Sequence, residues 1–350
     1  GGNVNLSTRK LTVENGATIA SFMFFGSGSG GDVIINSAES VEVVGEESDF
    51  SSSIITSTLG QGNSGRIVIN TDRLSLRDGG DIDSATLSSG NAGEIIIHAT
   101  EFVEIISKDI FTSIRSAGFT NKSLLDALGS PQILSGNGGK IAINTPQLEL
   151  AGISVISVAN NGTGIAGNLE INADSIFLSD GALVSASTAS GEGGNIKLDL
   201  SDLFVLRNRS QISATAGGTG NGGNIDIQAP FIVSNSGENN DIIANAFEGK
   251  GGKINITTQG LFGLKFREQL TDKSDITASS EFGINGTVQI NNVGIEPSSG
   301  LVELPELINT DVVIANSCVA RRNQQDSTFY ITGKAGFPYV PGEAVPSDYS

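Results

Sequence analysis

One pattern of aliphatic and polar residues recurs along residues 1–292. Each copy starts at a glycine, and aliphatic residues stand two and four positions later with a freely varying residue between them. The clearest pairs are Ile67 and Ile69, Ile95 and Ile97, Ile141 and Ile143, Ile225 and Ile227, and Ile254 and Ile256. This inside–outside–inside alternation is typical of a β-strand with one buried face. We therefore predict that each copy opens with such a strand and that its aliphatic side chains form the core.

The copies follow one another at a nearly constant spacing. Six of the nine gaps between successive anchor glycines are 27 to 29 residues long, and the other three are 34, 34 and 46 residues. The anchors are Gly2, Gly31, Gly65, Gly93, Gly139, Gly167, Gly194, Gly223, Gly252 and Gly286. A fixed period indicates a repeat protein whose units stack on their neighbours, and the longer gaps indicate insertions.

Two further short runs follow in most copies, such as "LSL" at 74–76 and "LVSAST" at 183–188. Turn phrases such as "SDGA" at 179–182 lie between them, and their Asx-Gly steps supply the positive φ that tight turns need. Three short strands in each unit of roughly 28 residues predict one coil of a parallel β-helix. We therefore predict an all-β solenoid of about ten coils over residues 1–292. An insertion at 119–134 interrupts it, and 293–350 form a C-terminal cap or linker with a Gly/Pro-rich tail.

A polar column accompanies the aliphatic ones. Asn36, Asn70, Asn144 and Asn172 each stand five positions after an anchor glycine. Asparagine tolerates turn geometry, and its amide groups can stack along an axis. We predict a structural amide ladder at these positions. His98, the only histidine, occupies the same column, and we expect it to replace an amide there rather than act as a base.

Composition narrows the functional classes. Lysine and arginine number 20 against 38 aspartates and glutamates, giving a formal charge of −18. This balance argues against nucleic-acid binding, which needs a cationic surface, and against a polybasic membrane contact. We expect no cofactor, although acidic corners would suit weak calcium binding. The single cysteine, Cys318, excludes an internal disulfide and a cysteine-based zinc site. No apolar run reaches the roughly 18 residues of a membrane-spanning helix, so we expect no insertion into a membrane.

The same composition points to an aliphatic interior. Glycine accounts for 46 of the 350 residues, aromatic residues for 5%, and tryptophan is absent. A core poor in large rings is expected to be layered and regular. Because the chain starts within a copy of the repeat, we expect it to be the C-terminal part of a longer polypeptide.

One group of charged residues is a candidate for chemistry. Its members are Asp78, Asp81, Asp83 and Arg115. If Ile82 and Ile114 stack, Asp83 and Arg115 face outward on adjacent coils near salt-bridge distance. Paired carboxylates on an outer sheet are what cleavage of a polysaccharide would require. An exposed ion pair between coils explains the same residues, and such pairs are worth little. We favour the structural interpretation and expect no enzymatic activity.

The C-terminal third also resembles a known family. The segments are "GLFGLKFREQLTDKSDITASSEFGINGTVQINN" (260–292), "PSSGLVELPE" (297–306) and "FYITGKAGFP" (329–338). They resemble the C-terminal region of large cyanobacterial exoproteins, which are filamentous-haemagglutinin-like passengers of two-partner secretion, often labelled S-layer family proteins. The chain departs from them in having "GKAGFP" where "GRGGLP" is usual, and in lacking a second cysteine near Cys318.

The resemblance implies a right-handed β-helix that is exported through an outer-membrane transporter of the two-partner type and works outside the cell or on its outer surface. With the repeat, it leads us to expect a structural and adhesive rod segment of a secreted exoprotein, with a glycan, cell-surface or matrix ligand. The alternative is a polysaccharide-degrading β-helix enzyme, either a lyase or a hydrolase. A purely architectural spacer is a third, weaker interpretation.

Overall fold

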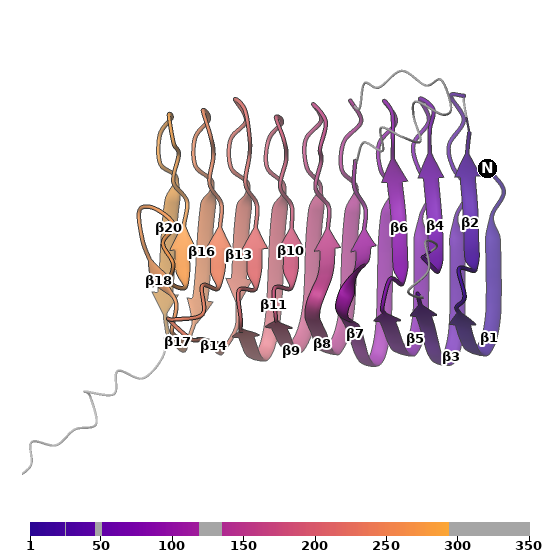
Figure 1. Cartoon of the computed structure of the whole chain (residues 1–350), viewed down its shortest axis with the longest axis horizontal. Helices are drawn as coiled ribbons and strands as arrows, with labels where there is room; N and C mark the ends of the chain where they lie inside the picture. The colour runs from indigo at the N-terminus through magenta and orange to yellow at the C-terminus, as the bar shows by residue number, and fades with distance from the viewer. Residues whose placement is uncertain (25, 46–50, 119–134, 294–350) are drawn as a thin grey trace, which may run out of the picture. The chain divides into compact units, whose positions relative to one another are not determined.

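The computed structural model describes residues 1–24, 26–45, 51–118 and 135–293 (Figure 1). The described residues contain strands and turns but no helix, so the predicted all-β class is confirmed. Successive repeats pair in parallel and stack side by side along one direction, which makes these residues solenoid-like. The predicted insertion at 119–134, and the predicted tail from residue 294 onward, lie outside the described residues.

The strands fall into groups by their place in the coil. Strands that join the first and second runs of a coil are β1 (Val4–Val13), β3 (Val33–Val44), β5 (Ile67–Arg77), β9 (Asn168–Ser179) and β11 (Asn195–Leu206). Strands that contain all three runs are β7 (Glu94–Arg115) and β8 (Lys140–Ser157). The first and second runs are separate strands in β13 (Asn224–Gln228) with β14 (Phe231–Ser234), and in β16 (Lys253–Thr258) with β17 (Gly260–Phe262). The last first run is β20 (Thr287–Asn292).

Third runs form a further row along the stack. They are β2 (Thr18–Met23), β4 (Ser53–Thr58), β6 (Asp81–Thr86), β10 (Leu183–Ser185), β12 (Gln211–Ser213), β15 (Asp241–Ile243) and β19 (Asp275–Thr277). One short strand has no counterpart in the other described coils, β18 (Lys265–Phe266), which pairs with β19.

The corner between the first and second runs differs from the prediction. We predicted separate short strands, but in seven described coils the strand continues through the corner and the ladder only shifts register, as between Leu200 and Leu203 of β11. The physical reason is that one to three unpaired residues absorb the bend as a bulge, while the flanking backbone keeps its bonds to the next coil.

The register between coils stacks residues of the same kind, as the repeat predicts. Toward one end of the stack, Ile225 pairs with Ile254, and Ile227 pairs with Ile256. Each outward residue between the paired isoleucines, such as Asp226, remains accessible to solvent. The two-residue alternation of the sequence is therefore the alternation of core and surface.

The isoleucine columns continue through the coils on either side of the 119–134 insertion. Ile69 pairs with Ile97, and Ile97 pairs in turn with Ile143. The neighbouring column is formed in the same way by Ile67, Ile95 and Ile141. All ten isoleucines of the predicted pairs have relative exposures of 0 to 1%, and they belong to one hydrophobic cluster that runs through the stack. The insertion therefore leaves the core columns unbroken.

The amide column forms hydrogen bonds between coils. The Asn70 side chain donates to Asn36 Oδ1 at 2.9 Å, and Asn172 donates to Asn144 Oδ1 at 3.0 Å. Asn144 Nδ2 lies 3.3 Å from His98 Nδ1, so the histidine contacts the same column. In each Asn–Asn pair, the NH₂ group of one side chain satisfies the amide oxygen of the other, at a corner where the backbone turns.

The anchor glycines mark the point where neighbouring coils approach most closely. A Cβ atom on Gly252 would overlap the carbonyl oxygen of Gly223, and a Cβ atom on Gly223 would overlap that of Gly194. Several anchors also donate their backbone N–H to the end of the preceding copy's third run: Gly223 N donates to Ala214 O and Gly252 N to Ala244 O, both at 2.7 Å. Only glycine fits this narrow neck, which closes the loop between the third run and the next coil.

We expect Gly252→Ala to destabilise the solenoid, because the added methyl group must push two coils apart. The loss in free energy of unfolding should be roughly 1–3 kcal/mol, measured by chemical denaturation with circular dichroism. Gly237→Ala is the control, since the nearest atom to its Cβ would be Asn235 Oδ1 at 3.9 Å. Equal effects of the two substitutions would contradict the importance of the neck.

Candidate functional site

The third runs bring three of the four predicted charged residues together. Asp81 and Asp83 lie on β6, and Arg115 ends β7, which contains the next coil's third run. In the register, Asp83 pairs with Arg115. Arg115 Nη2 lies 3.0 Å from Asp83 Oδ2 and 3.9 Å from Asp81 Oδ2, so one guanidinium serves two carboxylates.

Asp78 is not part of this group. It occupies the turn between β5 and β6 with a positive φ of 45°, and its carboxylate lies 3.5 Å from Ser107 Oγ. No ion pair or hydrogen bond of the described residues joins it to Asp81, Asp83 or Arg115. Its role there is to adopt the left-handed turn geometry that aspartate and asparagine accept.

The isoleucines of the repeat have the structural role that we predicted. Ile69, Ile97 and Ile143 are fully buried at 0% exposure, so they offer no surface to a ligand. Their contribution to the charged group is indirect, because the core columns fix the register that brings the outward residues of the third runs together.

The group of Asp81, Asp83 and Arg115 is more buried than the exposed ion pair that we expected from the sequence. Asp83 is only 5% exposed, and the Arg115 side chain is 23% exposed. The Arg115 guanidinium lies 5.4 Å from the centre of the Phe111 ring, and Ser113 Oγ donates to Asp81 Oδ1 at 2.7 Å. The repeat pattern does not indicate this burial, because it depends on what lies above the outer side of the sheet.

Burial sets the electrostatics of the two carboxyl groups. It raises the pKa of Asp83 to about 6, because the loss of hydration outweighs the attraction of Arg115, and nearby Asp81 adds to the rise. Burial also raises the pKa of Asp81, against the attraction of Arg115 and the hydrogen bond from Ser113. Asp83 Oδ1 is buried and has no hydrogen-bond partner among the described residues.

A second charged group lies farther along the same row of third runs, and the sequence analysis missed it. Asp241 begins β15 and Asp275 begins β19. Asp275 is fully buried and accepts hydrogen bonds from Arg267, from Thr271 N at 2.6 Å and from Thr271 Oγ1 at 2.9 Å. Through the paired coils, Asp241 occupies the same outward column as Asp81, which is the signal that an alignment of third runs would have revealed.

Asp241 resembles Asp83 in its electrostatics. Burial raises the pKa of Asp241 to about 6, against a hydrogen bond from Gln211 and the attraction of Arg267. Asp275 N also donates to Asp241 Oδ1 at 3.0 Å. The row of third runs therefore carries two groups of buried carboxylates, each with one arginine, separated by coils whose outward residues are mainly serine and apolar.

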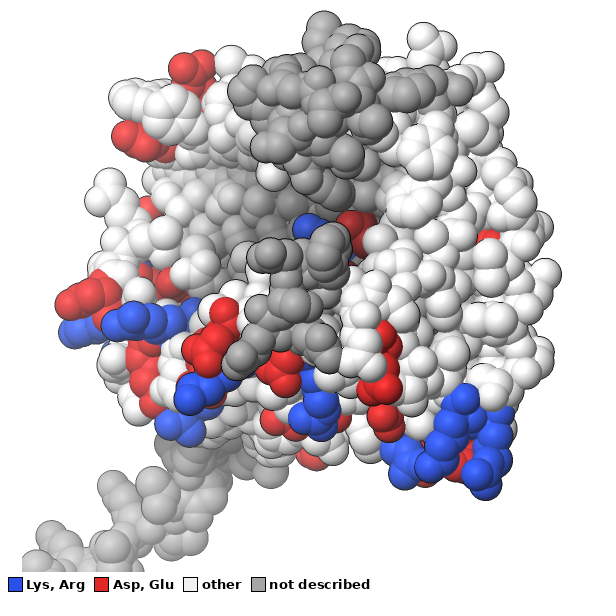
Figure 2. Space-filling model, turned by 45° about the vertical axis from the view of Figure 1, so that its right-hand side comes forward, with Lys and Arg blue, Asp and Glu red and all other residues white. Residues whose placement is uncertain are grey.

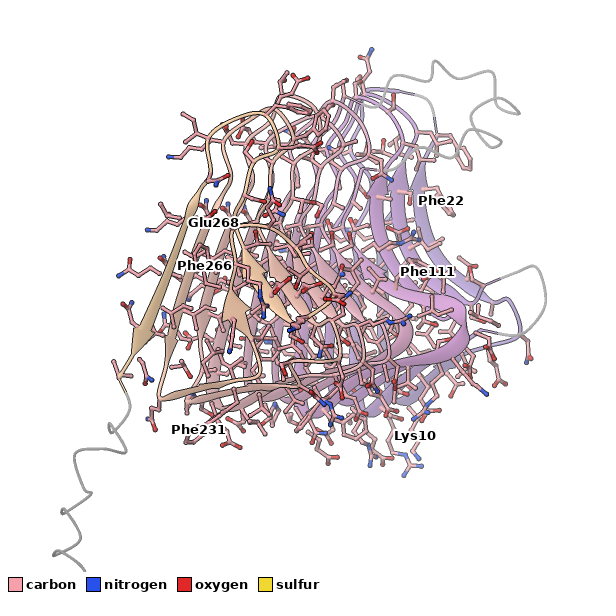
Figure 3. The ribbon with its side chains drawn as sticks, turned by 60° about the vertical axis from the view of Figure 1, so that its left-hand side comes forward. Lys10, Phe22, Phe111, Phe231, Phe266 and Glu268 are labelled. Carbon is pink, nitrogen blue, oxygen red and sulfur yellow. The ribbon has the colours of Figure 1, made fainter. Side chains whose placement is uncertain are left out.

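Two adjoining hollows open beside the second group, with volumes of about 190 and 470 Å³. Both are lined by Glu268, Ser279 and Asn285. Phe266 lines the smaller hollow, and Gln269 lines the larger. Phe266 and Glu268 come from the same segment, near one end of the stack, and Phe22 and Phe111 lie toward the other end (Figure 3).

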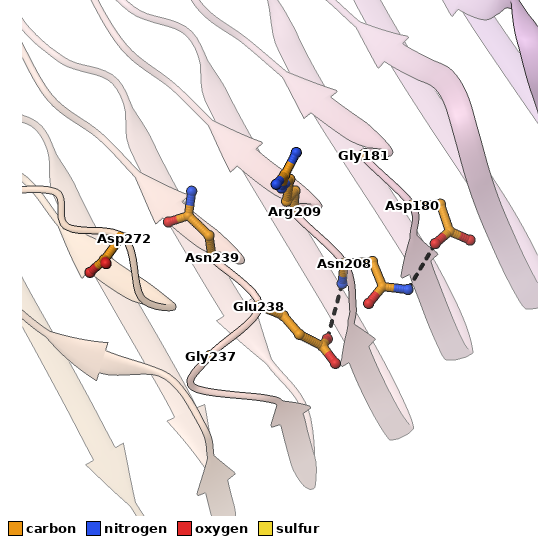
Figure 4. A pocket seen from close by; sticks show the side chains of 8 residues that line it. All are labelled: Asp180, Gly181, Asn208, Arg209, Gly237, Glu238, Asn239 and Asp272. Carbon is orange, nitrogen blue, oxygen red and sulfur yellow. Dashed lines mark hydrogen bonds between the residues drawn. The ribbon is translucent and has the colours of Figure 1, made fainter.

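A larger hollow of about 910 Å³ follows the turns before the third runs (Figure 4). It contains acidic residues, but the best placed of them is already engaged. Glu238 accepts two hydrogen bonds at 2.8 Å from Arg207 and one at 3.0 Å from Asn208 N, and these contacts lower its pKa to about 2. No group of three or more potential metal ligands occurs in the part of the chain that the structure describes. Weak calcium binding at acidic corners stays a prediction.

Elsewhere the charges are mixed. On the face in Figure 2, acidic and basic side chains gather along the lower edge, and much of the remaining surface is uncharged. Ion pairs join adjacent coils, for example Arg9 to Glu39 at 3.2 Å and Lys140 to Glu94 at 3.5 Å. These pairs are exposed and contribute little to stability. The described residues include no helix long and apolar enough to cross a membrane.

Comparison with protein-family models, with curated proteins and with solved structures found no match for this chain. The resemblance to secreted exoproteins therefore stays a prediction, and so do the partners and location that it implies.

We expect the stability of the solenoid to decrease as the pH rises from about 4.5 to 7.5. A carboxyl group with a raised pKa stabilises the folded state below its unfolded pKa, and this contribution disappears as the pH passes through the folded pKa, here about 6 for Asp83. Asp83→Asn keeps the shape and stays neutral, so it should remove about 2 to 3 kcal/mol of this pH dependence. Denaturant unfolding at several pH values measures it.

Asp241→Asn provides the comparison. It should remove its own share of the pH dependence, and the double variant should remove the sum, because sites that share no contacts behave additively. If the free energy of unfolding of Asp83→Asn depends on pH as steeply as that of the parent protein, the pKa of Asp83 is not raised in the folded state.

Proposed function

We propose that residues 1–292 form a right-handed parallel β-helix and serve as a structural and adhesive rod segment of a large secreted exoprotein. In this proposal the rod works outside the cell or on its outer surface, where it contacts glycans, other cells or matrix. The handedness and the secretion route come from the resemblance of residues 260–338 to two-partner-secretion passengers.

The observation that carries the proposal is the continuous register of the coils. Parallel pairing runs without a break from β1 to β20, and aliphatic residues stack on aliphatic residues in the inward columns of the first runs throughout. Outward residues of successive coils therefore lie at the strand spacing of about 4.8 Å. From β9 onward those of the first runs are polar, for example Glu170, Lys197 and Asp226. A repeated array suits multivalent contact with a repetitive ligand, where many weak interactions add up to a strong one.

The same architecture suits export through an outer-membrane transporter. Each coil contacts its immediate neighbours, so a chain that emerges end first can add coils one at a time to a folded template. The residues that pair between coils are 27 to 46 positions apart, for example Ile196 with Leu169 and Ile141 with Ile95. Folding on emergence would also help to draw the chain outward.

The test is binding without turnover. Purified protein should bind to intact cells or to immobilised polysaccharides, and should release no reducing ends from the same polysaccharides. A preparation unfolded by heat and rapidly cooled is the control for non-specific adhesion. Absence of binding across cells, matrix and a broad glycan panel would reject the adhesive function and leave only a spacer.

A second function has one specific observation in its favour. Buried Asp83 has an unpartnered oxygen and a pKa of about 6, and Asp81 lies beside it on the same strand. A protonated Asp83 could donate to a glycosidic oxygen while Asp81 activates water, which is the division of labour in polysaccharide hydrolases. This alternative makes residues 78–115 the site of a polysaccharide-degrading enzyme.

Reducing-end or unsaturated-product assays on acidic polysaccharides separate the two functions. If the protein is an enzyme, Asp83→Asn should lower the rate by at least about a hundredfold, because it removes the proton donor. Gly237→Ala, in the turn between β14 and β15, should keep the parent rate. A complete lack of product with every polysaccharide would exclude this alternative.

A further inference from the structure

We propose that the groove between residues 266–269 and residues 278–286 binds neutral, polyhydroxylated sugar units of a glycan chain. This inference rests on the proposed adhesive function and gives it a location and a ligand class. The groove is the pair of adjoining hollows that share Glu268, Ser279 and Asn285. Nothing in the repeat pattern requires it, since β18 and its flanking residues occur in one described coil only.

The floor of the groove is held in place by hydrogen bonds. Asn245 Oδ1 accepts from Ser279 N at 2.8 Å and from Thr277 Oγ1 at 3.2 Å. Asn285 Oδ1 accepts from Ser280 N at 2.8 Å. Because both amide oxygens are engaged with the protein, their NH₂ groups are the ends that remain to donate to a ligand.

The wall formed by residues 267–271 is fixed as well. Buried Asp275 accepts hydrogen bonds from Arg267 and from both the backbone and the hydroxyl of Thr271. Arg267 N also donates to Ile276 O at 3.1 Å, next to the pairing of β18 with β19. A wall held by a buried carboxylate loses little entropy on binding, so the groove is preorganised.

The rim of the groove supplies both kinds of polar partner. Glu268 and Glu281 provide acceptors, and Gln269 provides an acceptor and donors. None of these three side chains makes a hydrogen bond with the other described residues. A sugar hydroxyl donates one hydrogen bond and accepts others, so vicinal hydroxyl groups fit a set of alternating carboxylates and amides. Larger areas of hydrocarbon would not fit such a polar lining.

Phe266 gives the groove an apolar side. Its side chain lines the smaller hollow, and the residue is 54% exposed. The C–H face of a pyranose ring is apolar, and packing it on an aromatic face removes that face from water. The combination of one exposed ring with adjacent hydroxyl, amide and carboxylate groups is what recognition of a sugar requires, and Figure 3 shows Phe266 and Glu268 close to each other on this segment.

The negative charge of the groove favours neutral sugars over anionic ones. Two carboxylates, Glu268 and Glu281, line the groove. Arg267 also lines the smaller hollow, but its positive charge is engaged with buried Asp275. The protein as a whole carries a formal charge of −18. A uronate or sulfate would be repelled by both, and repulsion of like charges in a concave site is costly. Neutral hexose or pentose units are therefore the expected ligands.

The experiment titrates the whole chain with cellohexaose, maltohexaose and xylohexaose, and with an oligogalacturonate of the same length, by isothermal titration calorimetry. At least one neutral hexaose should bind, and the oligogalacturonate should bind at least about tenfold more weakly. Gln269→Ala and Phe266→Ala should each weaken binding of the neutral hexaose about tenfold, the effect of about 1.4 kcal/mol from one lost contact. Phe231→Ala, an exposed phenylalanine on β14, is the matched control and should leave binding unchanged.

Charge is tested with Glu268→Gln combined with Glu281→Gln. This variant should keep the neutral ligand and bind the oligogalacturonate more tightly than the parent protein does. Absence of binding by all three neutral hexaoses, equal binding in all variants, or preference of the parent for oligogalacturonate would each overturn the proposal.

The groove and the adhesive function can fail separately. If the groove variants adhere to cells as strongly as the parent protein while neutral hexaoses show no binding, only the groove proposal is wrong. If the parent protein binds a neutral hexaose but adheres to no cell or matrix, the groove stands and the adhesive function is wrong. Circular dichroism of every variant confirms that the solenoid is intact in each comparison.

Discussion

The structure depends on the close approach of one coil's backbone to the next at the anchor glycines. A side chain at these positions would overlap the preceding coil's carbonyl group, so the neck sets the distance at which the coils stack. That distance in turn lets the first runs pair in register, and the register places isoleucine on isoleucine. The hydrophobic core is therefore a consequence of backbone geometry as much as of residue type. Aliphatic residues fill columns whose positions the necks have already fixed.

The outward residues of the third runs differ from coil to coil, unlike the inward aliphatic residues. The outward column of the third runs holds mainly serine and apolar residues in the middle coils and aspartate in coils toward either end. Burying a carboxylate costs free energy unless hydrogen bonds or a cation compensate. Asp275 has such compensation from Arg267 and Thr271, whereas Asp83 keeps one oxygen without a partner. The two groups therefore differ in role. Asp275 holds the segment of Arg267 and Thr271 in place, whereas Asp83 has a carboxylate oxygen that is still able to form a hydrogen bond.

The loop around β18 links structure to the proposed binding surface. β19 pairs with β15 on one edge and with β18 on the other, so β18 occupies the edge that the next coil's third run would otherwise use. A covered edge is protected from pairing with other chains. The same segment presents Phe266, Glu268 and Gln269 to the two hollows. An element that ends a sheet therefore also creates the groove, with aromatic and polar walls, that we interpret as a sugar site.

The sequence by itself determined the class of the fold, because a two-residue alternation anchored to a glycine at a nearly fixed period can bury its aliphatic side chains only by stacking copies of itself. It also placed Asp83 opposite Arg115, since stacking Ile82 on Ile114 aligns their neighbours. It could not show that Asp83 is buried or that Arg267 and Thr271 bind Asp275. Burial depends on what covers the outer side of a sheet, and Arg267, which pairs with buried Asp275, comes from the segment around β18 that the other described coils lack. Only the tertiary structure decided these features, because the repeat specifies contacts between equivalent positions and says nothing about contacts made by the irregular segments.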